Sequence, residues 1–149
     1  MEKEINKKRE VLRIAVPLGA ALIVTHAVAV INDLYRSVPW IDILIHYGWA
    51  VALGFFVYLV IEHFPGHIDL SKNLFVTILV GLSLSGFGGI LWEFGEFMYD
   101  VTGGSFGLDL QDVQLGIGDT LKDLLVNMLG GMSVAIFVWL RYHKKRESL

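Results

Sequence analysis

Four long runs of apolar residues constrain this chain more than any other feature. They occupy residues 14–31, 40–61, 74–97 and 121–140. Each run approaches the ~20 residues that a helix needs to cross the hydrocarbon core of a bilayer. Lipid offers the backbone no hydrogen-bond partners, so the runs should be helical, and the sequence lacks the alternating pattern of a β-barrel. We therefore predict an all-α, multi-pass cell-membrane protein with a single domain of four transmembrane helices over residues 1–149.

The basic residues predict how these helices are oriented. Most of the 12 Lys and Arg residues lie before the first run or after the last one. Basic flanking segments stay in the cytoplasm, and four spans return both ends to one side, so we expect a cytoplasmic N-terminus and C-terminus. The connection at 63–72 should share that side, whereas 32–39 and 100–118 should face outward. The first run follows a basic stretch, as in a signal peptide, but its length favours a retained span.

Polar side chains inside three of the spans recur at helical spacing. They are Asp42 and His46 in the second span, Glu93 and Glu96 in the third, and Asp119, Lys122, Asp123 and Asn127 in the fourth. Separations of three and four residues place each set on one face of its helix. The predicted topology puts all three sets, together with His26, in the outer half of the membrane. Ionisable groups inside spans cost a few kcal/mol each and are functional candidates by default.

The charges of this cluster indicate what it binds. Five carboxylates face at most two cations, Lys122 and a protonated His46, so the excess must be protonated or neutralised by a bound ion. Carboxylate, amide and imidazole ligands suit Mg²⁺, Mn²⁺, Ca²⁺ or Zn²⁺. The predicted ligands of a divalent metal are Asp42, His46, Glu93, Glu96, Asp119 and Asp123. All of these except Asp119 are also the predicted catalytic residues, and Lys122 and Asn127 are the predicted substrate-binding residues.

Structural explanations compete with this interpretation for some of these residues. Asp119 or Thr120 could cap the fourth helix, in a capping box that pairs Thr120 with Asp123. Asp42 could be favoured by the dipole at a helix N-terminus, and His26 could be a hydrogen-bonded core histidine.

The two acidic residues of the third span do not have an equally simple structural explanation. Glu93 and Glu96 are harder to explain structurally, because they lie near a helix C-terminus, where the dipole disfavours carboxylates. We interpret the aromatic residues near span ends as anchors at the membrane interface. They are Trp40, Trp92, Tyr99 and Trp139.

Small residues spaced by four predict close packing of the helices. They are Gly48 with Ala52, Gly81 with Ser85 and Gly89, and Asn127 with Gly131 and Ala135. The 100–118 connection holds Asp100 and several glycines. It would be either a lid over an outward-facing site or a simple connector.

Three motifs resemble one known family. Asp42-x-x-x-His46, Trp92-Glu93-Phe-Gly-Glu96 and Asp123-Leu-Leu-Val-Asn127-Met-Leu-Gly-Gly are similar to the VanZ-like membrane proteins, and more so to the YjdF-like branch. The resemblance covers residues 40–140. It implies four or five spans and, for the namesake, a link to glycopeptide-antibiotic resistance, but no established reaction. Glu96 departs from the VanZ pattern, in which a Gln is usual.

These observations favour a membrane-embedded metal site that binds or acts on a lipid or a lipid-linked phosphate, with membrane lipid as its partner. Such a site would make the protein a metal-dependent enzyme or a lipid-binding protein. An ion or proton transporter is a second hypothesis, although the inner halves of the spans are almost purely apolar. A structural or accessory membrane subunit is a third. Nothing indicates nucleic-acid binding, and a homo-oligomer is left open.

Overall fold

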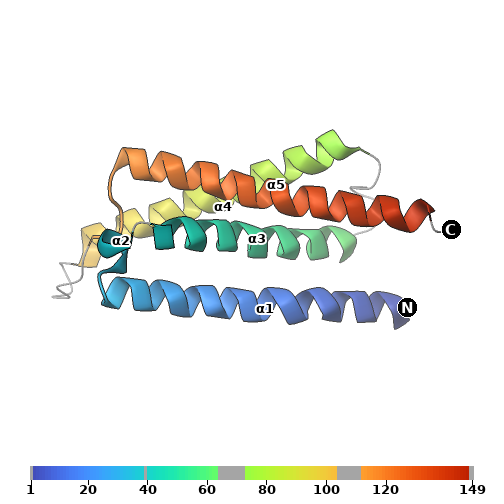
Figure 1. Ribbon diagram of the computed structural model, residues 1–149, viewed down its shortest axis with the longest axis horizontal. Helices are drawn as coiled ribbons and strands as arrows, with labels where there is room; N and C mark the ends of the chain where they lie inside the picture. The colour runs from blue at the N-terminus through green and yellow to red at the C-terminus, as the bar shows by residue number, and fades with distance from the viewer. Residues whose placement is uncertain (1, 39, 64–72, 104–111, 148–149) are drawn as a thin grey trace.

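The computed structural model describes residues 2–38, 40–63, 73–103 and 112–147, and all regular secondary structure in them is helical. There are five helices in these residues, four of them long, and the long ones run lengthwise in Figure 1. The five helices are α1 (Glu2–Ile31), α2 (Leu34–Ser37), α3 (Trp40–His63), α4 (Leu74–Gly103) and α5 (Ile117–Glu147).

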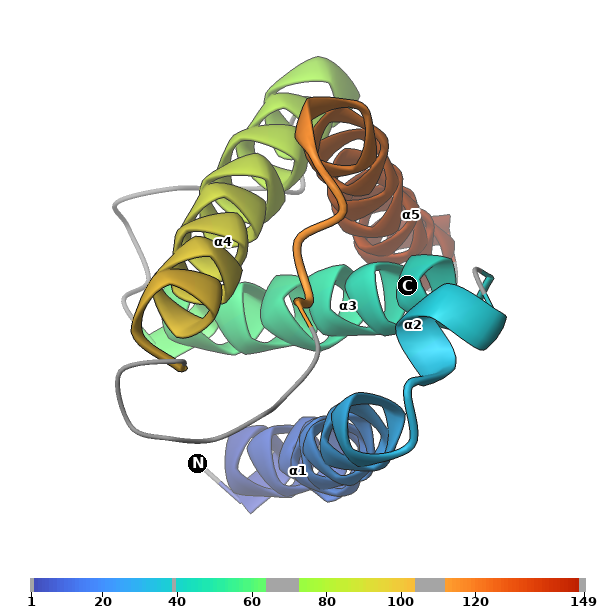
Figure 2. The same cartoon turned by 90° about the vertical axis from the view of Figure 1, so that its left-hand side faces the viewer.

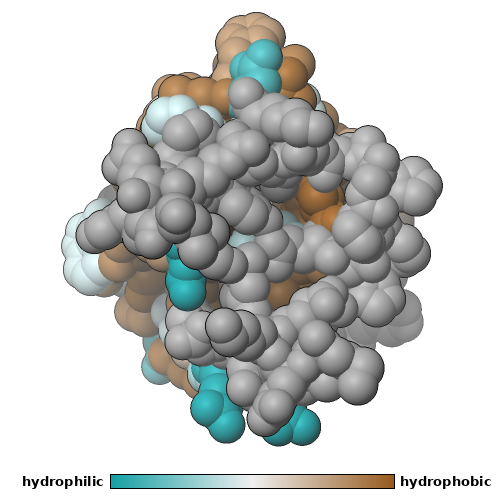
Figure 3. Space-filling view, turned by 90° about the vertical axis from the view of Figure 1, so that its right-hand side faces the viewer, coloured by the Kyte–Doolittle hydropathy of each residue, from teal (hydrophilic) through white to brown (hydrophobic). Residues whose placement is uncertain are grey.

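Three of these helices contain a segment that is long and apolar enough to cross a membrane. The segments are Trp40–Ile61, Leu74–Gly103 and Ile117–Arg141, and Val16–Ile31 in α1 is a shorter apolar stretch. Large hydrophobic side chains are exposed along these helices, Phe75 among them. Figure 3 looks onto the end that holds the termini, and the flank visible beside the grey atoms is mainly hydrophobic. An exposed apolar flank of this kind is expected of helices that face lipid.

The long helices form a three-helix core with α1 against one side. Helices α3, α4 and α5 contact one another, whereas the backbone of α1 approaches α3 and the short α2 (Figure 2). The start of α1 and the end of α5 lie at the same end of the molecule (Figure 1). Helix α2 and the start of α3 lie at the opposite end. The fold therefore has a terminal end and an α2 end.

Small residues allow the core helices to approach closely, as their spacing predicted. A Cβ atom added to Gly131 of α5 would lie 2.5 Å from the carbonyl oxygen of Gly81 in α4. A Cβ added to Gly130 would lie 2.7 Å from the Cβ of Ala50 in α3. Helix α5 therefore contacts α4 and α3 where glycine leaves room, as in membrane helix pairs with small residues at the interface.

The four long helices all extend beyond their apolar runs, and the extensions of α4 and α5 correct several interpretations. Helix α5 begins at Ile117, so Thr120 lies inside it and the capping-box interpretation is wrong. Helix α4 continues to Gly103, so Glu93 and Glu96 lie well before its last turn. At that distance from the C-terminus the helix dipole no longer opposes a carboxylate. Asp100 lies in α4 rather than in a connection. The residues of the proposed lid at 104–111 and of the connection at 64–72 lie outside the described residues.

The short helix α2, which the sequence did not predict, closes the α2 end of the bundle. Its Tyr35 is buried in an apolar cluster with Ala29, Ile45 and Val113. Burial raises the pKa of the Tyr35 hydroxyl, so this group stays protonated at neutral pH. The carboxylate of Asp100 accepts two backbone N–H groups, from Val113 and its neighbour, each at 2.9 Å. These contacts fasten the segment before α5 to the end of α4.

Candidate functional site

The predicted polar residues of three helices meet in the half of the bundle nearest the α2 end. The buried members are Asp42 and His46 from α3, Glu93 and Glu96 from α4, and Asp123 and Asn127 from α5. On each helix these residues are spaced by three or four, which directs them to the same face. Because α3 and α5 begin near this end and α4 approaches its C-terminus there, the three faces lie at one depth.

His46 lies at the centre of the cluster and is 2% exposed. Its Nε2 atom lies 3.3 Å from a carboxylate oxygen of Asp42, 3.8 Å from Glu93 and 4.0 Å from Asp123. One imidazole nitrogen thus faces carboxylates from all three core helices. Buried carboxylates this close together repel one another unless a proton or a cation lies between them.

Lys122 supplies the positive charge at the edge of the cluster. Its Nζ atom lies 3.0 Å from Asp42, 2.5 Å from Asp119 and 3.4 Å from Asp123. The side chain is 36% exposed, so the ammonium group is accessible from outside the cluster. A single ammonium cannot neutralise all the carboxylates around it, and Glu93 and Glu96 have no ion pair to Lys122 among the described contacts.

Asn127 sets the orientation and the tautomer of His46. Its Nδ2 group donates to the Nδ1 atom of His46 and to the backbone carbonyl of Asp123, both at 2.9 Å. In this arrangement a neutral His46 carries its proton on Nε2, facing the carboxylates. Coordination of a metal by Nε2 requires that proton to leave and the amide of Asn127 to turn, so that its oxygen accepts the Nδ1–H group.

Trp92 joins the cluster to a second histidine. Its indole N–H donates to Glu96 at 2.8 Å, and its ring makes edge contacts with His26 and His46. Trp92, which the sequence suggested as an interfacial anchor, is half-buried and packs against side chains of the bundle. Its position four residues before Glu96 was the sequence signal for this hydrogen bond.

His26 has the structural role that one alternative assigned to it. Its Nδ1 atom and the hydroxyl of Tyr35 share a hydrogen bond of 2.6 Å. It belongs to neither of the groups of side chains spaced for a metal ion. Helix α1 thus contributes a satisfied polar group beside the cluster.

Two overlapping sets of side chains among the described residues are spaced to hold a metal ion. One set is Asp42, His46 and Asp123, and the other is His46, Glu93 and Glu96. Within each set the candidate ligand atoms lie within 4.8 Å of one another. Both sets use His46, so they describe a single candidate centre rather than two separate ones.

Three buried polar atoms of the cluster lie near charged groups but make no hydrogen bond among the described residues. The Nε2 atom of His46, Oε1 of Glu93 and Oδ1 of Asp123 are buried without a hydrogen bond in the part of the chain that the structure describes. Buried polar atoms without partners are rare in folded proteins and call for an explanation such as a bound ion or water. Asp119 is outside both metal-spaced sets, and it pairs with Lys122 instead.

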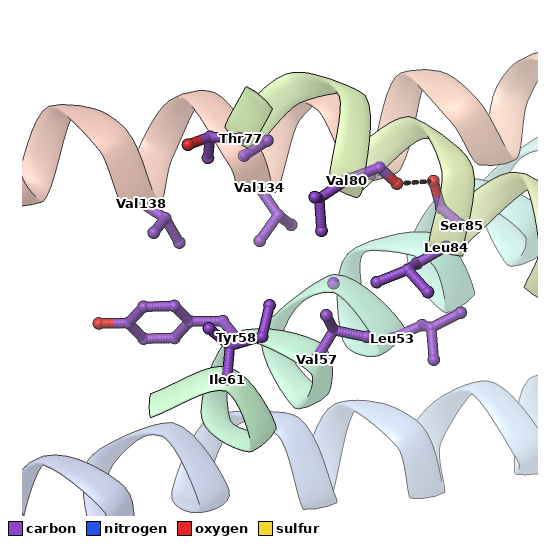
Figure 4. A pocket seen from close by; sticks show the side chains of 14 residues that line it. Leu53, Val57, Tyr58, Ile61, Thr77, Val80, Leu84, Ser85, Val134 and Val138 are labelled. Atoms are coloured by element: carbon purple, nitrogen blue, oxygen red, sulfur yellow. Dashed lines mark hydrogen bonds between the residues drawn. The ribbon is translucent and has the colours of Figure 1, made fainter. Parts of the chain in front are cut away.

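Toward the terminal end, the core beyond the cluster contains a small void with a mostly apolar lining. Figure 4 shows a small void among α3, α4 and α5, with a volume of about 30 Å³. The hydroxyls of Thr77 and Ser85 line it, and they donate to the backbone carbonyls of Asn73, just before α4, and of Gly81. A void of this size holds a few water molecules at most.

Comparison with known proteins gives two matches. The family described as "Predicted membrane protein (DUF2238)" matches residues 5–145. A Thermotoga maritima protein described as "Uncharacterized protein" is 26% identical over 113 residues, which make up 76% of this chain and 53% of that protein. The chain therefore spans about half the length of this relative. No solved structure matches the chain.

Proposed function

This chain belongs to the DUF2238 family of predicted membrane proteins, and we propose that its buried cluster binds a divalent metal ion and binds or acts on a lipid or a lipid-linked phosphate. The observation that carries the proposal is the surroundings of His46 Nε2. This atom is buried, lacks a hydrogen bond among the described residues and faces carboxylates from three helices. An ion there would neutralise charge that one lysine leaves uncompensated.

Each member of the cluster has a role in this proposal. His46 is a metal ligand in both sets, with Asp42 and Asp123 completing one and Glu93 and Glu96 completing the other. Carboxylate-rich sites with one imidazole suit Mg²⁺, Mn²⁺, Ca²⁺ or Zn²⁺. A cation held here would polarise a phosphoryl oxygen or activate a water molecule.

Two further residues would assist this centre. Lys122 meets the anionic head group, since its ammonium group is partly exposed at the edge of the cluster. Asn127 orients His46 from the opposite side of the ring. Outer hydrogen-bond partners of a metal-bound histidine typically affect metal affinity by about 10-fold to 100-fold.

The same observations weigh against transport across the membrane. A pathway for ions needs polar groups or water through the full thickness. Between the cluster and the terminal end, the described core has the void of about 30 Å³, lined mostly by aliphatic residues and glycine. The hydroxyls of Thr77 and Ser85 in its lining already donate to the backbone carbonyls of Asn73 and Gly81.

We also propose that α1 crosses the membrane with the three apolar helices, which would place both termini in the cytoplasm. The basic residues at both ends of the chain and the common position of the start of α1 and the end of α5 support this topology. The cluster would then lie in the outer half of the membrane.

The motifs around His46, Glu93 and Asp123 are the basis for proposing a distant relationship to the VanZ-like proteins, through the YjdF-like branch.

A reporter at the C-terminus tests the topology. We expect a reporter domain that functions only in the cytoplasm to be active when it is fused after Leu149, because the basic end is retained there. A reporter domain that functions only outside the cytoplasm, fused at the same position, should be inactive. The opposite pattern would overturn the orientation and with it the outward position of the cluster.

Metal content and phosphate chemistry test the function itself. We expect purified protein to retain a divalent metal by elemental analysis, and His46→Gln to lose it. Protein in vesicles should bind or turn over a lipid phosphate in a metal-dependent manner, with no ion flux. His26→Gln is the matched control, because it removes a nearby histidine that lies outside both metal-spaced sets. Ion flux without binding or turnover of a lipid phosphate would assign the cluster to transport instead.

A further inference from the structure

An apolar cleft leads away from the cluster along the length of the bundle. It lies between α1, α3 and α4 and has a volume of about 480 Å³, within the usual range for ligand pockets. Its lining includes Val16 and Gly19 of α1, Ala52 and Phe56 of α3, and Gly88 of α4. Almost all of the lining surface is apolar, so the cleft offers little to a polar solute.

The cleft and the cluster share a boundary. Asn127 and Trp92 both line the cleft. Asn127 donates to His46, and Trp92 donates to Glu96, so each residue contacts the cluster on one side and the cleft on the other. A molecule with a polar group at the cluster could therefore place an apolar tail in the cleft without a gap between them.

The cleft exists because α1 leaves α4 uncovered. The backbone of α1 packs on α3, with Leu22 beside Gly48, and makes no backbone approach to α4 or α5 within the described residues. Figure 2 shows α1 set apart from α4 on the side of α3. Val16 and Phe56 at the rim are 63% and 55% exposed. The cleft thus opens sideways, on the flank where the exposed side chains are hydrophobic.

The dimensions favour an elongated hydrocarbon occupant. The α3 lining runs from Trp49 to Phe56, about 10 Å along a helix axis. Because the long helices run lengthwise in Figure 1, the long direction of the cleft follows the direction of lipid chains in a bilayer. Phospholipid surrounds any membrane protein, so its chains reach this lateral opening without crossing water.

We propose that this cleft holds an acyl chain of a membrane phospholipid whose phosphate head group lies at the cluster. The inference rests on the proposed function, and it narrows the substrate class to a phospholipid that enters sideways between α1 and α4. Because the chain comes from lipid rather than from water, its fit depends on van der Waals packing against the apolar side chains of the cleft and not on the hydrophobic effect. The cluster would then need to recognise only the head group.

Gly19 allows the cleft to be filled without disturbing the helix packing. A Cβ added there has nothing within 4 Å, so a phenyl ring from Gly19→Phe would extend into open space. Val24→Phe is the matched control, because Val24 is 62% exposed on the same helix and does not line the cleft. Val16→Phe, which adds bulk at the rim of the cleft, is a second variant in case Gly19→Phe fails to fold.

Quenching of tryptophan fluorescence reports directly whether a lipid acyl chain occupies the cleft. Trp49 and Trp92 line the cleft, so each variant is made in a background with Trp40→Phe and Trp139→Phe. The probe is a vesicle of phosphatidylglycerol carrying bromine atoms on one acyl chain, compared with the same lipid without bromine. We expect roughly a twofold or greater loss of quenching in Gly19→Phe and Val16→Phe, since the rings occupy the space of the chain, and no loss in Val24→Phe.

Three outcomes would overturn the inference. Equal quenching in all variants would mean that no chain occupies the cleft, even if the cluster binds metal normally. Equal losses in Val24→Phe and Gly19→Phe would mean that bulk on α1 acts wherever it is placed. Displacement of the brominated chain by a polyprenyl phosphate, and not by unbrominated phosphatidylglycerol, would assign the cleft to another lipid. Loss of quenching confined to the two cleft variants, in a protein that binds no metal, would support the cleft and refute the proposed metal function.

Discussion

Asp123→Asn and Glu93→Gln should lower the melting temperature of the protein in the presence of divalent metal. A metal that binds the folded state stabilises it by about 4 kcal/mol when its free concentration is 1,000 times its Kd. For a chain of this length, that stabilisation corresponds to a shift in Tm of roughly 10 °C. Each substitution removes one carboxylate ligand while keeping nearly the same side-chain volume, so the loss should come from the metal.

A chelator separates this cause from a simple relief of repulsion. Chelation should destabilise the unsubstituted protein and leave both variants almost unchanged, because they have already lost the ion. If protons hold the cluster together instead, removing a carboxylate relieves repulsion between like charges. The variants would then melt higher than the unsubstituted protein, and the chelator would have no effect. Such a result would refute the metal site.

The experiment is a melting series in detergent at one pH, with and without chelator, on samples whose metal content is measured. Asp112→Asn is the matched control. Its carboxylate is 68% exposed and pairs with Arg36 at the surface, where an ion pair contributes little. Its Tm should respond to metal and chelator as the unsubstituted protein does.

Gly131→Ala should destabilise the bundle, although it adds only one methyl group. That methyl carbon would lie 2.5 Å from the carbonyl oxygen of Gly81 and would also meet the Ser85 side chain. Backbone atoms cannot turn aside as a flexible side chain can, so α4 and α5 must separate. Overpacking of this kind typically costs about 1–3 kcal/mol and occasionally more.

Gly19→Ala is the matched substitution with the opposite expectation. Its new methyl group has nothing within 4 Å, and alanine in a helix interior is favoured over glycine by roughly 0.5–1 kcal/mol. Thermal melting and size-exclusion profiles in detergent would measure both variants. Equal stability of the two would contradict the close contact of α4 and α5 at Gly131.

The helices of this protein were largely predictable, because the bilayer imposes simple requirements on sequence. The second and third apolar runs begin at Trp40 and Leu74, and α3 and α4 begin at the same residues. Hydropathy marks where a helix is apolar, and it does not mark where the backbone stops being helical. For that reason α4 extends past its apolar run to Gly103 and α5 begins before its own, at Ile117.

The membership of the cluster was also visible in the sequence, because spacing by three or four residues defines a helix face. The positions of Asp42, Glu93 and Asp123 at one depth followed from the order of the spans. What one helix face meets on another depends on how the helices rotate and tilt against each other. No local pattern contains that information.

Tertiary structure alone therefore decided which atoms meet. It placed His46 Nε2 among three carboxylates, turned Asn127 toward the other ring nitrogen, and directed the indole of Trp92 to Glu96. It also set α1 apart from α4, which opens the cleft beside the cluster. The sequence by itself determined the apolar helices and their polar faces, because both depend on residues close together in the chain. The site depends on contacts between Asp42, Glu93 and Asp123, which are far apart in the chain and meet only when the helices pack.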